Sequence, residues 1–256
     1  MPQAFAFRAF GAKSRNTSRL RGCLTLEMNT DSATTRFRET LEDKASAYGV
    51  ALGPAALEGL SKYYELLNVW NSRVHLVAPC SPQEFATRHV LESLLLLKYL
   101  PNDAGVAEVG AGAGLPILPC LIVRPDLRAV LIEASQKKAV FLREALTKTA
   151  TSKQATVIAE RFENVAGPAV GFVTCRALER FEEMLPLLLE WAPARATLLL
   201  SGGQRLERRI EDLGWMCVTA PIFFSPRSDG PRLALCDDHG VRAAVLKCAQ
   251  LGERIG

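Results

Sequence analysis

The sequence predicts an α/β fold in which a doubly wound, mostly parallel seven-stranded sheet follows a helical N-terminal segment. From residue 106 onward, short apolar runs alternate with amphipathic stretches, as in parallel sheets that helices cover on both faces. A glycine-rich turn follows the first of these runs. Residues 33–100 instead show helical periodicity and no strand signal. A chain of 256 residues is long enough for one such domain with a modest appendage.

Residues 1–30 form a tail that precedes any periodic pattern. The first 26 residues carry a charge of +5 and the whole chain carries +4, so the other 230 residues carry −1. The basic balance therefore belongs to the tail and is no evidence for nucleic-acid binding by the body. The composition of the tail fits an organelle transit peptide. It also fits a disordered extension or an upstream start codon ahead of Met28, and we favour these two interpretations.

Three helices are expected in the segment over residues 31–101. The first carries apolar residues at spacings of three and four and ends at Gly49. The second opens at Pro54, because proline suits the first turn of a helix. The third follows Ser81, reaches Tyr99 and ends before Pro101.

Strands and helices then alternate through residues 102–256. The expected strands are Val106–Val109, Ala129–Glu133, Thr156–Ala159, Gly171–Cys175 and Thr197–Leu200. The expected helices are Leu115–Val123, Gln136–Thr149, Glu179–Trp191 and Gln204–Leu213, with Ser135 as an N-cap and Gly214 as a C-cap. Two or three extended segments follow at Cys217–Phe224, Leu233–Cys236 and Arg242–Lys247 and close the sheet with an antiparallel strand.

Three glycines occupy the turn between the first strand and its helix. Gly110 permits a sharp turn with positive φ, Gly112 lets a ligand lie against bare backbone, and Gly114 brings helix and strand close together. Glu108 stands two residues before this turn, and Glu133 ends the next strand. A carboxylate at that second position accepts hydrogen bonds from ribose hydroxyls.

Two classes of cofactor use such a turn. Dinucleotides prefer G-x-G-x-x-G, because the helix N-terminus receives a pyrophosphate, whereas this chain has G-x-G-x-G. The carboxylate of Glu108 would repel a pyrophosphate but suits an ammonium and a sulfonium. Pro116 and Pro119 also remove amide donors from the first turn. The sequence therefore predicts S-adenosyl-L-methionine as cofactor and a class I, Rossmann-like methyltransferase fold, with a nicotinamide oxidoreductase as a remote alternative.

Several short motifs follow one another in a characteristic order between Leu57 and Gly203. They are Trp70-Asn71, Arg88-His-Val-Leu-Glu-Ser93, Glu108 to Pro116, Leu131 to Ser135, Arg161-Phe-Glu163 and Cys175-Arg-Ala177. In order and spacing they resemble the ribosomal RNA small subunit methyltransferase G family, also called the glucose-inhibited division protein B family. The resemblance implies methyl transfer to N7 of a guanosine in 16S rRNA. It also implies cofactor contacts at Gly110, Leu115, Glu133, Phe162, Glu163 and Arg176.

Guanine N7 carries a lone pair and no proton, so this reaction needs alignment of the reacting atoms and no general base. Catalytic roles are therefore assigned to side chains that can hold the base. Arg176 is the first candidate, because it ends the fourth strand and a guanidinium can stack on a base or bind its acceptors. Arg161 and His89 are the others. The alternatives are an ion pair of Arg176 with Glu163 or Glu179, a solvated surface charge at Arg161 and a core histidine at His89.

The expected partner is 16S rRNA or the small ribosomal subunit, and the protein is predicted to be a cytoplasmic monomer, or organellar if the tail is a transit peptide. One predicted helix and the turn after it support RNA binding through Lys137, Lys138, Arg143, Lys148 and Lys153. The sequence has no zinc-ligand spacing and no apolar stretch near the ~20 residues that span a bilayer. Two alternatives remain, namely a methyltransferase acting on a small molecule or protein, and a catalytically silent RNA- or ribosome-binding module. The second remains because Ser201 replaces the usual lysine of the family.

Overall fold

A computed structural model describes residues 32–176, 180–193, 196–201, 209, 216–221, 232–238 and 241–246. The tail over residues 1–30, the helix expected at Gln204–Leu213 and the C-cap at Gly214 lie outside this part of the chain, apart from residue 209. The strands are β1 (Gly105–Val109), β2 (Arg128–Ile132), β3 (Ala155–Ile158), β4 (Phe172–Arg176), β5 (Thr197–Ser201), β6 (Met216–Pro221), β7 (Arg232–Asp238) and β8 (Val241–Leu246). Helices α5 (Ile117–Val123), α6 (Gln136–Lys148) and α7 (Phe181–Trp191) and the short helix η4 (Phe162–Asn164) connect the first five strands.

One sheet contains all eight strands in the order β3-β2-β1-β4-β5-β8-β7-β6. Strands β1 to β5 and β8 are parallel, and β7 runs antiparallel to both β8 and β6. The doubly wound, mostly parallel sheet with an antiparallel closing strand is thereby confirmed. Within the described residues the sheet has eight strands instead of the expected seven, because all three extended segments after residue 214 pair with a neighbour.

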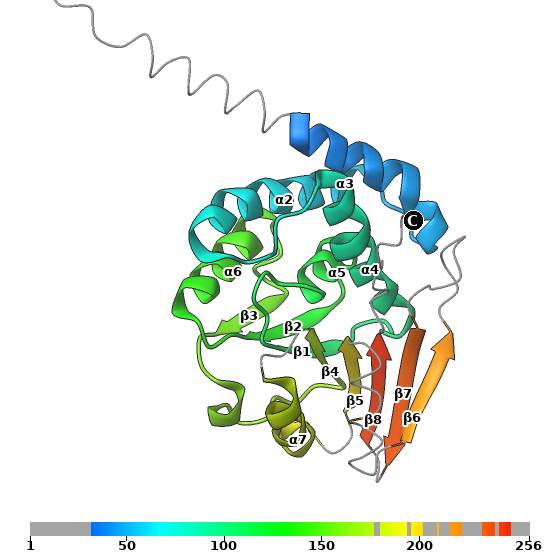
Figure 1. Cartoon of the computed structure of the whole chain (residues 1–256), viewed down its shortest axis with the longest axis vertical. Helices are drawn as coiled ribbons and strands as arrows, with labels where there is room; N and C mark the ends of the chain where they lie inside the picture. The colour runs from blue at the N-terminus through cyan, green and yellow to red at the C-terminus, as the bar shows by residue number, and fades with distance from the viewer. Residues whose placement is uncertain are drawn as a thin grey trace, which may run out of the picture.

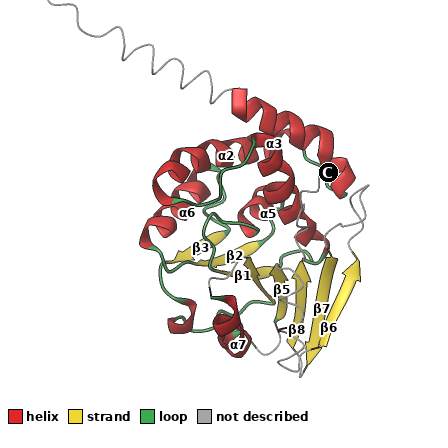
Figure 2. Ribbon diagram, viewed as in Figure 1, coloured by secondary structure: helices red, strands yellow, loops and turns green. Residues whose placement is uncertain are grey.

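Helices cover the sheet on both faces (Figures 1 and 2). One core cluster joins the N-terminal helices, α5 and α6 to the sheet, and a second joins α7 and η4 to the other face. Alternate residues of β1 illustrate the division, because Val106 belongs to the first cluster while Ala107 and Val109 belong to the second. Short, apolar strands are expected where both faces are buried. The N-terminal helices therefore share one core with the sheet.

The three expected N-terminal helices are present. The first covers residues 32–44 and continues as the 3₁₀ helix η1 (Ala45–Tyr48), which Gly49 ends with a φ of 70°. The second is α2 (Pro54–Val74), with Pro54 in its first turn. The third is not one continuous α-helix. It consists of α3 (Pro82–Glu84), a π-helix η2 (Phe85–Leu91), α4 (Glu92–Leu94) and a 3₁₀ turn η3 (Leu95–Lys98).

The π-helix accompanies side chains that compete for backbone acceptors. The Thr87 hydroxyl donates to the carbonyls of Gln83 and Glu84, and the Ser93 hydroxyl donates to the carbonyl of His89. Such contacts are typical where a helix departs from regular i to i−4 bonding. A search for apolar residues at helical spacing does not distinguish this segment from an α-helix, because Phe85, Ala86 and Val90 are still buried at spacings of four and five. The wider turn contains Arg88 and His89, and π-turns recur at functional sites.

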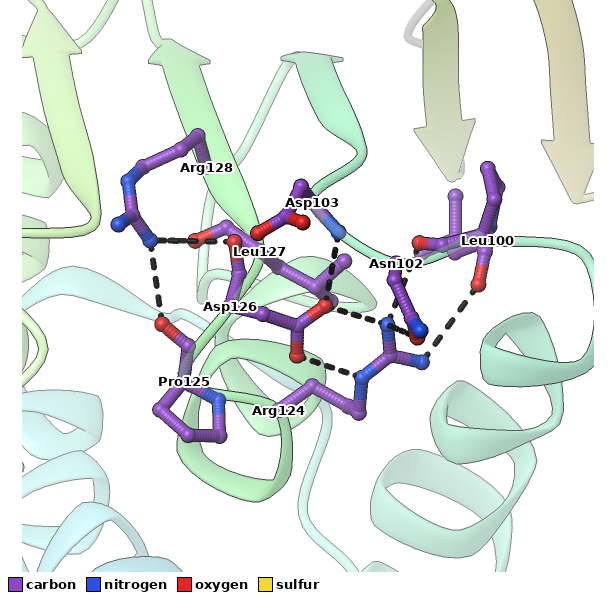
Figure 3. Close-up of polar contacts among 9 residues, drawn as sticks. Leu100, Asn102, Asp103, Arg124, Pro125, Asp126, Leu127 and Arg128 are labelled. Atoms are coloured by element: carbon purple, nitrogen blue, oxygen red, sulfur yellow. Dashed lines mark hydrogen bonds and ion pairs between the residues drawn. The ribbon is translucent and has the colours of Figure 1, made fainter.

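The loop before β1 is bound to the loop before β2 at the amino edge of the sheet (Figure 3). Arg124 donates through Nε to the Asp126 carboxylate over 2.7 Å and through Nη2 to the Pro101 carbonyl and to Oδ1 of Asn102. Asp126 in turn accepts from the Asp103 amide at 3.0 Å. The hydrogen bond from Arg124 holds the pKa of Asp126 well below its usual range. This network ties the end of the helical segment to the sheet, on the edge away from the strands' carboxyl ends.

Gly59 lets α2 and α5 approach closely. A Cβ at this position would lie 2.7 Å from Cγ2 of Ile122. Gly59→Ala should therefore lower the free energy of unfolding by about 1–2 kcal/mol, because overpacking outweighs the gain of ~1 kcal/mol in helix propensity. Urea denaturation measures this change. Adding Ile122→Ala removes the obstructing methyl, so the glycine substitution should then stabilise the protein. An unchanged or higher stability of the single variant would contradict the close approach.

Candidate functional site

A pocket of about 500 Å³ opens at the carboxyl ends of β1, β2 and β4. This is the point where the strand order reverses in a doubly wound sheet, and ligands bind there. Nearly all of the predicted site residues line it: Gly110, Gly112, Leu115, Glu133, Phe162, Glu163, Arg176, Arg161 and His89. Glu108 and Gly114 do not. The fold thus brings predicted site residues that are as far apart in sequence as His89 and Arg176, which are separated by 87 positions, to one cavity.

The glycine turn has the backbone that its sequence predicts. The φ values are 68° at Gly110, 50° at Gly112 and 79° at Gly114. At these positive values a residue with a side chain would be strained. The amides of Gly110 and Ala111 both donate to the Ile132 carbonyl, which fixes the turn against β2. A Cβ on Gly112 would meet nothing closer than a carbonyl oxygen at 3.7 Å, so this stretch of backbone is open. Gly114 instead packs against α5 and α6.

Glu133 fixes the turn from the neighbouring strand. Its Oε2 accepts from the Gly112 amide at 2.7 Å, and its Oε1 accepts from the Ser135 amide at 2.8 Å. A carboxylate offers roughly four acceptor positions, so Glu133 can accept two further hydrogen bonds from a ligand. Ser135 is the N-cap of α6, as predicted, and accepts from the Lys138 amide.

Glu108 lies behind the pocket wall and is fully buried. Its Oε2 accepts from the Ile117 amide at 3.3 Å, while no described residue bonds to its Oε1. Burial raises the pKa of Glu108 to about 8, against the lowering effects of the Ile117 amide and Arg176. The predicted carboxyl group therefore lies beneath the glycine turn, but at pH 7 it is mostly the neutral acid and not the charged carboxylate expected from the sequence. One of its oxygens lacks a partner among the described residues.

The raised pKa of Glu108 predicts a pH dependence of stability. The folded chain holds a proton here that the unfolded chain loses near pH 4.5, so stability falls as pH rises from 4.5 to about 8. His89 acts in the opposite direction, because its lowered pKa makes stability rise with pH through 6.5, but this effect is the same in Glu108→Gln, so the difference between the two proteins from pH 6.5 to 8 isolates Glu108. Over this pH range we expect the free energy of unfolding of wild type to fall by about 1–2 kcal/mol, and that of Glu108→Gln to change little. Chemical denaturation at each pH measures this, and parallel profiles for the two proteins would refute the raised pKa.

Arg176 and His89 meet at the wall of the pocket. Nη2 of Arg176 lies 3.3 Å from Nδ1 of His89 and donates to the Arg88 carbonyl at 3.1 Å. Burial first, and then Arg176 and Arg88, lower the pKa of His89 to about 4. The ring is therefore neutral at pH 7, and its Nδ1 accepts a hydrogen bond from the guanidinium of Arg176. The alternative ion pair of Arg176 with Glu179 lies outside the described residues, and the Glu163 carboxylate pairs with Arg161 at 2.8 Å.

Phe162 forms an apolar part of the pocket lining next to β3. It is 6% exposed and packs edge-on against Trp191 of α7, with ring centroids 5.7 Å apart. Trp191 also donates to the Val165 carbonyl at 2.7 Å, so α7 holds this turn in place. Arg161 is exposed at the rim. Cys175 is buried in β4, and burial raises the pKa of its thiol to about 12, as expected for strand packing and not for a nucleophile.

Two residues at the site were not assigned a role there by the sequence. The Tyr63 hydroxyl, fully buried in α2, donates to the carbonyl of Ala113 in the glycine turn at 2.8 Å. Asn71, named above only as part of the Trp70-Asn71 motif, accepts from the amides of Leu76 and Val77, which line the pocket. A tyrosine on the buried side of an amphipathic helix needs a partner for its hydroxyl, which was the available signal for Tyr63.

Among the described residues, no group of three or more His, Cys, Asp or Glu side chains could hold a metal ion. None of the helices in that same part of the chain has the length and apolarity needed to cross a membrane.

Comparison with known proteins identifies the family. The family model for rRNA small subunit methyltransferase G matches residues 56–220. The protein of that name from Sorangium cellulosum is 36% identical over 185 residues, which cover 70% of this chain and 77% of the relative. Its namesake from Halorhodospira halophila is 31% identical over 69% of this chain and 83% of its own length, and that from Xanthomonas axonopodis pv. citri is 40% identical over 50% and 60%. The chain therefore belongs to the rRNA small subunit methyltransferase G family.

Proposed function

We propose that this chain transfers a methyl group from S-adenosyl-L-methionine to N7 of a guanosine in small-subunit rRNA. The observation that carries the proposal is one pocket that joins the glycine turn and Glu133 on one side to Arg176 and His89 on the other. The family's name supports rRNA as the substrate class. We further propose that the enzyme acts as a monomer, on 16S rRNA or the small subunit, in the cytoplasm.

The residues fit this cofactor. Glu133 lies at the end of β2 with free acceptor capacity for ribose hydroxyls, and Gly112 leaves bare backbone beside it. Phe162, Leu115 and Ile132 supply apolar lining suited to an adenine ring. Glu108 adds a buried carboxyl oxygen that lacks a partner among the described residues. When bound, the cofactor supplies an electrophilic methyl group on a sulfonium.

The chain's own residues then act by holding and orienting the base. Arg176 projects a guanidinium, anchored by His89 and the Arg88 carbonyl, at the carboxyl end of β4. A guanidinium can donate to the acceptor edge of guanine or stack on its face. His89 accepts at Nδ1, so its Nε2 carries the proton and can donate to the base or to an RNA oxygen. Because N7 has a lone pair and no proton, no side chain needs to remove one.

The deciding experiment supplies the protein with methyl-labelled cofactor and naked 16S rRNA, assembled small subunits or a mixture of small molecules. The proposal expects label in RNA that is released as N7-methylguanine after hydrolysis. Calorimetry in parallel measures cofactor binding without substrate. Tight cofactor binding with label in no RNA would overturn the proposed substrate while leaving the family assignment intact.

A further inference from the structure

We propose that the substrate RNA crosses the pocket mouth on its α6 side, with its phosphates bound by a basic surface made of Lys137, Lys138, Arg143, Lys148 and Lys153. This inference rests on the proposed function. Lys138 lines the pocket, and the other four side chains are exposed on α6 and the turn that follows it. The surface therefore begins at the pocket and leads away from it along α6.

The cations of this α6 surface differ from seven basic residues elsewhere in the described chain that acids neutralise. Arg38, Lys44, Lys62, Arg88, Arg124, Arg161 and Arg180 each form an ion pair with a neighbouring acid. Within the described ranges, none of the five α6-surface cations forms one, and Arg143 donates only to the Val157 carbonyl. Paired charges are largely neutralised, whereas unpaired cations attract the phosphates of a nucleic acid.

Two of the lysines stand where a helix disfavours them. Lys137 and Lys138 lie in the first turn of α6, which contains no acidic residue. The helix dipole places partial positive charge at this end, so cations there reduce helix stability and acids increase it. The lysines and the dipole together concentrate positive potential beside the pocket mouth, which suits a polyanion.

The rim of the pocket around η4 and α7 carries more acid than base, with Glu160, Glu163 and Glu183 against Arg161 and Arg180. Arg161 pairs with Glu163 at 2.8 Å, and Arg180 pairs with Glu183 at 3.2 Å. Carboxylates along that rim would repel a phosphate backbone. The asymmetry between the two rims gives the path of the RNA a direction, over α6 and away from η4 and α7.

A charge-neutralising variant tests the proposal. Lys137→Gln, Arg143→Gln and Lys148→Gln are combined, and Lys138 is left intact because it lines the pocket. The matched control combines Arg38→Gln, Lys44→Gln and Lys62→Gln, which removes three cations from the N-terminal helices. Filter binding of labelled naked 16S rRNA is measured at several salt concentrations, together with cofactor affinity and the transfer rate at saturating RNA.

The α6 variant should bind the RNA about 10- to 100-fold more weakly near 0.1 M salt, with a salt slope smaller by about 2–3. Its cofactor affinity and its rate at saturating RNA should stay within about twofold of wild type, and the control should bind as wild type does. Equal RNA binding by the two variants would overturn the proposal. So would an α6 variant that binds naked RNA normally and loses activity only on assembled subunits, because that result assigns the surface to a ribosomal protein.

The two proposals fail in different ways. If wild type methylates no RNA but the α6 variant loses RNA binding, the binding surface stands and the proposed reaction falls. If wild type methylates 16S rRNA and the α6 variant binds that RNA as tightly as wild type at every salt concentration, the proposed reaction is supported and the proposed binding surface is refuted.

Discussion

Replacing Arg176 with alanine should lower kcat/KM for RNA methylation by about 100- to 1000-fold, or roughly 3–4 kcal/mol of transition-state stabilisation. The guanidinium lies at the pocket wall, held by His89 Nδ1 at 3.3 Å and the Arg88 carbonyl at 3.1 Å. No other residue on β4 offers a comparable donor, since Cys175 is buried and Thr174 donates to the Leu199 carbonyl. Single-turnover transfer of labelled methyl groups to 16S rRNA measures the effect.

Two companion variants make the Arg176 result specific. Arg176→Lys keeps the positive charge but loses the planar guanidinium with its paired donors, so its kcat/KM should also fall at least tenfold. Arg161→Ala removes an exposed, ion-paired guanidinium from the rim of the pocket, so its kcat/KM should fall less than tenfold. Calorimetry separates the two roles assigned to Arg176, because cofactor affinity should change only a few fold if the residue acts on the base. Activity of Arg176→Ala within about threefold of wild type would refute the assignment.

Gly114→Ala should destabilise the protein by about 2–5 kcal/mol. The position has a φ of 79°, which costs alanine roughly 1–2 kcal/mol. Its Cβ would also lie 2.9 Å from Leu118 Cβ and 3.2 Å from Leu142 Cδ2, and both leucines are fully buried. Overpacking of this kind costs about 1–3 kcal/mol more. Thermal and urea denaturation measure the loss.

Gly112→Ala is the matched control for Gly114→Ala. Its φ of 50° brings a similar conformational cost, but the nearest atom to the added Cβ is 3.7 Å away. It should therefore lose only about 1–2 kcal/mol of stability. Its larger effect should be on cofactor affinity, since the open backbone beside Glu133 would be covered. Equal destabilisation by the two substitutions would show that the contacts at Gly114 carry no weight.

The sequence predicted those features that depend on local pattern. Strand and helix alternation located β1 to β5, α5, α6 and α7 to within two residues at most boundaries. The glycine spacing predicted the turn, because positive φ at Gly110, Gly112 and Gly114 is a property of residue type. The carboxyl-edge rule then brought Glu133, Phe162 and Arg176 to one pocket, since parallel strands end on the same side.

The remaining features depend on contacts between distant segments. The hydrogen bond from Tyr63 to Ala113 joins residues 50 positions apart, and no periodicity encodes it. Among the described residues Arg176 contacts His89 and the Arg88 carbonyl, 87 and 88 positions away, and no local pattern predicts these contacts. The π-helix at Phe85–Leu91 still buries apolar residues at spacings of four and five, so a search for helical periodicity cannot tell it from an α-helix. The count of strands required knowing how the segments after residue 214 pair.

The hydrogen bond between Tyr63 and Ala113 has a consequence for how this protein can be divided or recombined. Methyltransferase sheets and their accessory segments look like exchangeable units when they are read along a chain. Here the accessory helix supplies a donor to the cofactor turn and shares a core with β1, β2 and α6. A chimera that imports the N-terminal helices of a distant relative would have to import a tyrosine hydroxyl at the same spot, along with complementary packing. Sequence changes in these helices are therefore constrained by the need to keep the glycine turn in place.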